Sequence, residues 1–181
     1  MKARTLMGAL LAGVVGLAAA PASAAVLSTN TWYQFGFNEV DGPLGAPQLG
    51  ALTNPSPVAL DAGPWTFNLS GPANLFITDA QVSGDWFTLY DFGNLLGSTS
   101  LGNPGASDCS SDLGCALASG DYPTGLFALG AGDHSITGIW HGVIGTGDGA
   151  LIIQEVPEPI TLTLFGAGLA GAAALRRRKK A

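Results

Sequence analysis

The middle of this 181-residue chain has no positively charged side chain, because no Lys or Arg occurs between Arg4 and Arg176. All 13 acidic residues lie in that interval, from Glu39 to Glu158. A segment of this charge repels phosphate backbones and anionic lipid headgroups, which excludes nucleic acid as a partner. A buried carboxylate would need backbone N–H groups, hydroxyls or a metal ion in place of a cation. We therefore expect most of these acids to be exposed.

Cysteine and histidine are scarce, with two of each. Cys109 and Cys115 lie six apart in CSSDLGC, a Ser-, Asp- and Gly-containing stretch typical of a loop. In an oxidising compartment this spacing predicts a disulfide. A metal site built from the cysteines with His134 or His141 would have too few closely spaced ligands, so we predict neither a metal nor a cofactor.

Motifs of common enzyme classes are also missing: the chain has no G-x-S-x-G, H-E-x-x-H or P-loop. Asp133, His134 and Ser135 are neighbours on an apparent strand, so their side chains alternate between faces and cannot form a triad together. A carboxylate pair for glycoside hydrolysis stays open, but no pattern selects one. The acids available for it are Glu39, Asp79, Asp85, Asp91 and Asp121. We predict a non-enzymatic protein.

What the middle does contain is short alternating segments between turns, in a chain with 27 Gly and 11 Pro. Apolar residues alternate in TWYQFGF, WTFNL and NLFITDAQV, which indicates strands. DWFTLYDFGNLLGSTS predicts a hairpin, and two further strands are expected in GAGDHSITGIWHGVI and GALIIQEV. Residues 41–64 are expected to form a long loop. Residues 25–155 are thus predicted to be all-β, an antiparallel β-sandwich with a jelly roll as the alternative.

The N-terminal segment has the features of a signal peptide. Lys2 and Arg4 precede an apolar run that ends in Ala22-Ser23-Ala24, a small-x-small cleavage pattern. Residues 1–24 are therefore predicted to be removed by signal peptidase after Ala24. The mature protein would begin at Ala25, outside the cytoplasm.

The C-terminal segment has the features of a membrane anchor. Residues 160–175 carry no charge and are rich in Leu, Ala and Gly. As a helix they would span about 24 Å, slightly less than a hydrocarbon core of about 30 Å. Positive charge beside such a segment stays cytoplasmic, which is the role predicted for the residues that follow. They are Arg176, Arg177, Arg178, Lys179 and Lys180.

The order of Pro-Glu-Pro, apolar run and basic tail in residues 156–181 resembles the PEP-CTERM sorting signal of Gram-negative, exopolysaccharide-producing bacteria. The resemblance implies recognition by exosortase, a membrane cysteine protease or transpeptidase, through Val156, Pro157, Glu158 and Pro159. It also implies a transient membrane anchor and a final place at the cell surface or in the extracellular matrix. The run from Ile77 to Ser100 is similar to the globular part of many such proteins, which has no established activity.

Two functions stay open for the middle domain. It could be a structural component associated with exopolysaccharide or biofilm, or a carbohydrate-binding module whose exposed aromatic rings stack on sugars. The candidate rings are Trp86, Tyr90, Tyr122 and Trp140. Calcium could assist such binding through Asp108, Asp112 or Asp148, but the chain has no D-x-D-x-D-G loop, which favours scattered solvated acids.

Overall fold

The computed structural model describes residues 24–142 and 145–157. The predicted membrane segment at 160–175, the basic residues Arg176–Lys180, the motif residues Glu158 and Pro159, and the predicted signal peptide up to residue 23 lie outside these ranges. In the described part of the chain, no helix has the length and apolar character needed to cross a membrane.

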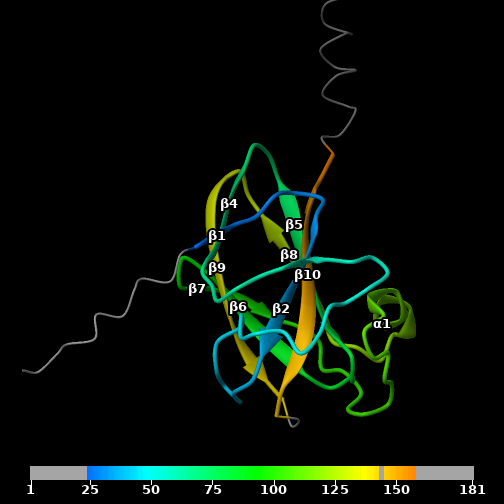
Figure 1. Cartoon of the computed structure of the whole chain (residues 1–181). Helices are drawn as coiled ribbons and strands as arrows, with labels where there is room; N and C mark the ends of the chain where they lie inside the picture. Colours follow the sequence, from blue (N-terminus) through cyan, green and yellow to red (C-terminus); the bar gives the residue numbers. More distant parts are fainter. Residues whose placement is uncertain (1–23, 143–144, 158–181) are drawn as a thin grey trace, which may run out of the picture.

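The described residues form ten strands in two five-stranded sheets, with one short helix (Figure 1). The first sheet has the order β1 (Ala25–Val26), β4 (Trp65–Leu69), β9 (Gly132–His141), β6 (Trp86–Asp91) and β7 (Asn94–Ser98). The second has the order β3 (Val58–Ala59), β2 (Trp32–Phe37), β10 (Gly147–Glu155), β5 (Ala73–Ala80) and β8 (Thr124–Leu129). Both sheets are mixed, because β1 runs parallel to β4 and β3 parallel to β2. The prediction of a purely antiparallel fold is wrong in these two short edge pairs.

The eight longer strands form nested pairs: the first pairs with the last, the second with the next to last, and so on toward the middle of the sequence. β2 pairs with β10, β4 with β9, β5 with β8, and β6 with β7, all antiparallel. This nested pairing describes one long hairpin rolled over into two sheets, which is how a jelly roll connects its eight strands. The topology therefore matches the jelly-roll alternative, and the predicted hairpin at 86–100 is its innermost turn.

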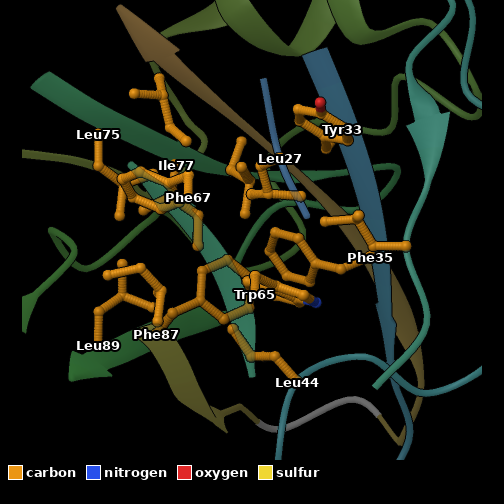
Figure 2. Close-up of a cluster of buried hydrophobic side chains, with 14 of the residues drawn as sticks. Leu27, Tyr33, Phe35, Leu44, Trp65, Phe67, Leu75, Ile77, Phe87 and Leu89 are labelled. Atoms are coloured by element: carbon orange, nitrogen blue, oxygen red, sulfur yellow. The ribbon is translucent and has the colours of Figure 1, made fainter. Parts of the chain in front are cut away.

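Aromatic side chains from the two sheets meet in a common core (Figure 2). Phe35 of β2 lies 5.3 Å, between ring centroids, from both Trp65 of β4 and Phe87 of β6. Phe37 packs on Trp140 of β9 at 4.9 Å. All five rings are buried. The alternation read in TWYQFGF and WTFNL thus correctly identifies residues that face the interior.

The second sheet is covered on its outer side as well. Leu52, from the predicted long loop, and Leu113 pack against Ala80 of β5 and Ala150 of β10. Leu113 begins helix α1 (Leu113–Ser119), which lies beside this sheet in Figure 1. β5 and β10 are therefore buried on both faces, unlike the strands of a simple two-layer sandwich.

Helix α1 differs from the sequence prediction, because the composition of CSSDLGC is typical of a loop. Asp112 caps its start by accepting a hydrogen bond from the Cys115 backbone N–H at 3.0 Å. Gly120 ends it with a left-handed φ of 73°. The Asp and Gly signals were present in the sequence, but seven residues are too few for apolar periodicity to show.

Replacing the ring at the centre of the core should be costly. We expect Phe35→Ala to lower the free energy of unfolding by about 3–5 kcal/mol, because it removes contacts to both sheets and leaves a cavity. Phe92→Ala, at a site 61% exposed, is the matched control and should change it by less than about 0.5 kcal/mol. Urea titration of both variants measures the difference, and equal effects would contradict the proposed core.

Candidate functional site

Polar and aromatic side chains gather on the outer face of the first sheet, where β6 and β9 pair. Trp86 stands directly opposite His141 in the strand register. Their rings stack, with centroids 4.0 Å apart and planes 22° from parallel. His141 Nδ1 lies 2.6 Å from Asp41 Oδ1, and its Nε2 lies 3.0 Å from Thr88 Oγ1. The imidazole is thus fixed at both nitrogens, and it in turn supports the partly exposed indole of Trp86.

A recess of about 480 Å³ opens beside this stacked pair, and we call it the Trp86 recess. Its lining residues are Val40, Asp41, Gly84, Trp86, Leu101, Gly102, Pro104, His141 and Gly142. Val40 and Leu101 are 53% and 76% exposed, and the Asp41 side chain is 73% exposed. An aromatic and aliphatic surface with one accessible carboxylate suits a ligand that has an apolar face and hydroxyl groups.

Asp41, His141 and Thr88 follow the acid, imidazole and hydroxyl order of hydrolase triads. However, Thr88 is only 9% exposed, and its hydroxyl also lies 2.9 Å from Ser98 Oγ. A hydroxyl so enclosed is poorly placed to attack a substrate. The arrangement is therefore better suited to holding the Trp86 ring than to nucleophilic chemistry.

The second histidine serves the fold. His134 Nδ1 lies 2.7 Å from Asp91 Oδ2 on the neighbouring strand, and its Nε2 lies 3.0 Å from the Gly130 carbonyl. Asp133 points the other way, where it accepts a hydrogen bond from the Asn68 amide at 2.7 Å. The side chains of the adjacent residues Asp133 and His134 thus lie on opposite faces of β9, as the strand alternation predicts.

Two of the four predicted stacking rings belong to the interior. Trp140 is 0% and Tyr122 3% exposed, so neither can serve as a platform for a sugar. Trp140 packs in the jelly-roll core, and the Tyr122 hydroxyl accepts a hydrogen bond from the Cys109 backbone N–H at 2.9 Å. Of the four candidates, Trp86 and Tyr90 remain partly exposed.

Three acids are buried, which corrects the expectation of surface solvation for Asp79, Asp85 and Asp148. Asp79 accepts hydrogen bonds from the backbone N–H groups of Ala80, at 2.8 Å, and of Asp85, at 3.3 Å. Burial, and then the Asp85 charge, raise the pKa of Asp79 to about 9. Burial raises the pKa of Asp85 to about 6. At neutral pH the pair therefore holds one proton, on Asp79.

Asp85 Oδ1 and Trp140 Nε1 are buried without a hydrogen-bond partner in the described residues. Both lie beside Gly142, where any side chain would overlap them. Within residues 24–142 and 145–157, no three His, Cys, Asp or Glu side chains come close enough to share a metal ion. Asp79 and Asp85 are linked by the hydrogen bond from the Asp85 backbone N–H to the Asp79 side chain, and the proton is held on Asp79.

The three acids considered for calcium are each used within the protein. Asp148 accepts from the Leu49 backbone N–H at 3.1 Å and from the Gln81 amide at 2.7 Å, and burial raises its pKa. Asp108 accepts from the Ser110 backbone N–H at 2.8 Å, and Asp112 caps α1. Backbone and amide groups thus replace the missing cations, as the sequence required.

The predicted disulfide is present. Cys109 and Cys115 are bonded, with Cα atoms 5.6 Å apart. The bond ties the strand-like segment at Cys109 to helix α1, in which Cys115 lies. It therefore links two parts of the segment that covers the outer side of the second sheet. Neither cysteine lines the Trp86 recess.

Both predicted processing points flank the folded body. Ala24 is exposed directly before β1, whereas Ala22 lies outside the described residues. β10 ends at Glu155, and the Val156 backbone N–H donates to the Pro72 carbonyl at 2.9 Å. Val156 and Pro157 are exposed and line a recess of about 460 Å³ at this end of the body.

Residues 155–179 match the family model described as the PEP-CTERM protein-sorting motif. The chain therefore carries this motif, and the resemblance seen in residues 156–181 is confirmed. The match begins at the last residue of β10. The motif implies export and exosortase-dependent sorting to the cell surface.

Among solved structures, the chain is similar to the pre-peptidase C-terminal domain of collagenase from Bacillus anthracis, with 14% identity and a TM-score of 0.41. The alignment covers 76% of this chain and 100% of that domain. A likeness at this level says nothing about function. No curated protein matches the sequence.

The proton on buried Asp79 should make the protein more stable in mild acid. Asp79 keeps its proton when folded up to a pKa of about 9, against an ordinary value of 3.8. The folded state therefore binds more protons between these values, and stability falls as pH rises. We expect the free energy of unfolding to be about 1–4 kcal/mol higher near pH 5 than near pH 8.

Asp79→Asn should flatten this pH dependence, because an amide does not ionise. Asp61→Asn, at an exposed site, is the control and should keep the wild-type slope. Denaturant titrations across this pH range measure both. A wild-type protein that gains stability on going from mild acid to mild base would contradict the assignment.

Breaking the disulfide should have a modest effect. The loop that it closes is small, so the double variant Cys109→Ser with Cys115→Ser should lose about 2 kcal/mol of stability. Ser111→Ala, at an exposed site within the same closed loop, is the control and should change stability by less than about 0.5 kcal/mol. Thermal denaturation compares the two variants. A loss of cooperative folding in the cysteine double variant would contradict the prediction, because it would show that the whole fold depends on the disulfide.

Proposed function

We propose that this chain is an exported, non-enzymatic surface protein whose jelly-roll body is released or transferred at its C-terminal motif and associates with exopolysaccharide in a matrix or biofilm. In this proposal residues 160–175 are a transient membrane anchor. The basic residues from Arg176 to Lys180 hold the C-terminus on the cytoplasmic side until exosortase acts.

The position of the motif carries this proposal. The matched segment starts at Glu155, where β10 ends, and the sheet's last contact is the hydrogen bond from Val156 to Pro72. Pro157 has no backbone N–H and disfavours helix in the residue before it. Neither the β10 strand nor a following helix can therefore extend through this junction, so it stays accessible to a processing enzyme.

The non-enzymatic part of the proposal rests on the contacts of the acids and histidines. His134 and Asp91 bond to each other, Asp79 accepts a hydrogen bond from the Asp85 backbone N–H, and the Thr88 hydroxyl beside His141 is enclosed. Each group is used in holding the fold. A highly acidic surface keeps such a body soluble outside the cell.

A saccharide-binding module is the second candidate, and the Trp86 recess favours it. Trp86 is partly exposed on a strand, although aromatic rings on strands usually face the core. Its support by His141 gives it a defined orientation. This candidate is compatible with sorting to the surface.

The intact mass of the protein from envelope and medium tests the processing. We expect a species that begins at Ala25 and ends between Val156 and Pro159, with or without an added group. Intact mass is required because trypsin has no site between Arg4 and Arg176.

Glu158→Gln should lower the processed fraction by about tenfold, because exosortase would lose a charge-assisted hydrogen bond to this carboxylate. Glu39→Gln, an exposed acid of the body, is the control and should be processed normally. A mature wild-type protein that keeps Arg176–Lys180 would overturn the role of exosortase and leave a membrane-anchored domain.

A further inference from the structure

We infer that the Trp86 recess binds a neutral saccharide, with a sugar ring stacked on Trp86 and its hydroxyl groups hydrogen-bonded to Asp41. The inference rests on the proposed association with exopolysaccharide. It identifies the part of the body that makes the contact and the class of sugar that it accepts.

The first argument is the pre-organised ring. His141 stacks on Trp86 at 4.0 Å and is itself held by Asp41 at 2.6 Å and Thr88 at 3.0 Å. Trp86 and His141 both line the recess. Because the side chain is already ordered, a ligand that stacks on it loses little further conformational entropy.

The second argument is the polar group beside the ring. Asp41 is fixed by its backbone N–H, which donates to the Trp140 carbonyl at 3.0 Å, and by the bond from its Oδ1 to His141. Its side chain is nevertheless 73% exposed, so Oδ2 can accept hydrogen bonds from a ligand. Hydroxyls bonded to a carboxylate make stronger hydrogen bonds than neutral pairs do.

The third argument is the size and surface of the recess. Its volume of about 480 Å³ lies within the roughly 300–1,000 Å³ of small-molecule sites. Val40, Leu101 and Pro104 add aliphatic surface around the ring. A pyranose presents the same combination from its own side, with C–H groups on one face and hydroxyls at the rim.

The charge of the body selects the kind of sugar. The recess contains Asp41, and the segment between Arg4 and Arg176 offers no Lys or Arg to neutralise a ligand's charge. Uronic acids and sulfated or phosphorylated sugars would be repelled. The occupant is therefore a neutral glycan.

The experiment uses the exported protein purified from its host. Its probes are neutral hexasaccharides of glucose, mannose and galactose, the neutral polysaccharide fraction of the host matrix, and hexagalacturonate as the anionic comparison. Intrinsic tryptophan fluorescence and calorimetry measure the dissociation constants. We expect a neutral probe to bind with a Kd of about 1 mM or below, at least about tenfold more tightly than hexagalacturonate.

The variants separate the recess from the rest of the sheet. Trp86→Ala should weaken binding at least about tenfold, Trp86→Phe by less, and Asp41→Asn by about fivefold. Tyr90→Ala is the matched control, because Tyr90 is a partly exposed aromatic residue on the outer face of the same strand but does not line the recess. It should bind within about twofold of wild type. Trp86→Phe keeps a ring, so it gives a reading even if the alanine variant folds poorly.

Absence of binding to every neutral probe, tighter binding of hexagalacturonate, or an equal loss in Tyr90→Ala would overturn the inference. Matrix fractionation separates this failure from failure of the proposed function. If Trp86→Ala protein stays in the matrix as fully as wild type, the recess is not the contact although the function stands. If processed wild-type protein is absent from the matrix, the proposed association itself fails.

Discussion

The fold depends on aromatic rings that join its first long strand, β2, to the opposite sheet. Phe35 and Phe37 point from β2 into the interior, where they pack on Trp65, Phe87 and Trp140. The neighbouring strand makes room for them: a Cβ at Gly149 would overlap the ring of Phe35, and one at Gly147 that of Phe37. Glycine on β10 and phenylalanine on β2 are therefore complementary across one strand pair. This pair closes the jelly roll, so the sandwich and the face that carries Trp86 both rest on it.

The absence of cations imposes a second constraint on the same framework. A carboxylate taken into the interior cannot form an ion pair with Lys or Arg here, so it is held by backbone N–H groups and amides or it keeps its proton. Asp148 follows the first route, and Asp79 the second. At the surface, Asp41 bonds to His141. The body thus uses its few histidines and its own backbone where other proteins use Lys and Arg.

Features set by neighbouring residues could be predicted, and those set by distant ones could not. The strands, the hairpin at 86–100, the disulfide and the sorting motif follow from alternation or spacing within a short stretch. Burial of Asp79 and Asp85 depends on how separate strands close over them, which no local pattern records. Trp86 could be named from the sequence, but its support could not, because Asp41 and His141 lie 100 residues apart. Helix α1 was missed since its cap and Gly signals were outweighed by a loop-like composition.

The strand that leads into the sorting motif is also an inner strand of its sheet. β10 lies between β2 and β5, and Glu155 at its end pairs with Ala73. In a chain that is exported from its N-terminus, this strand is the last of the body to arrive. Until it does, β2 and β5 have no shared neighbour and the sheet stays divided. On the proposed export route, the sheet can therefore close only when the residues directly before the motif have emerged, so folding of the body and delivery of the motif would be linked in time.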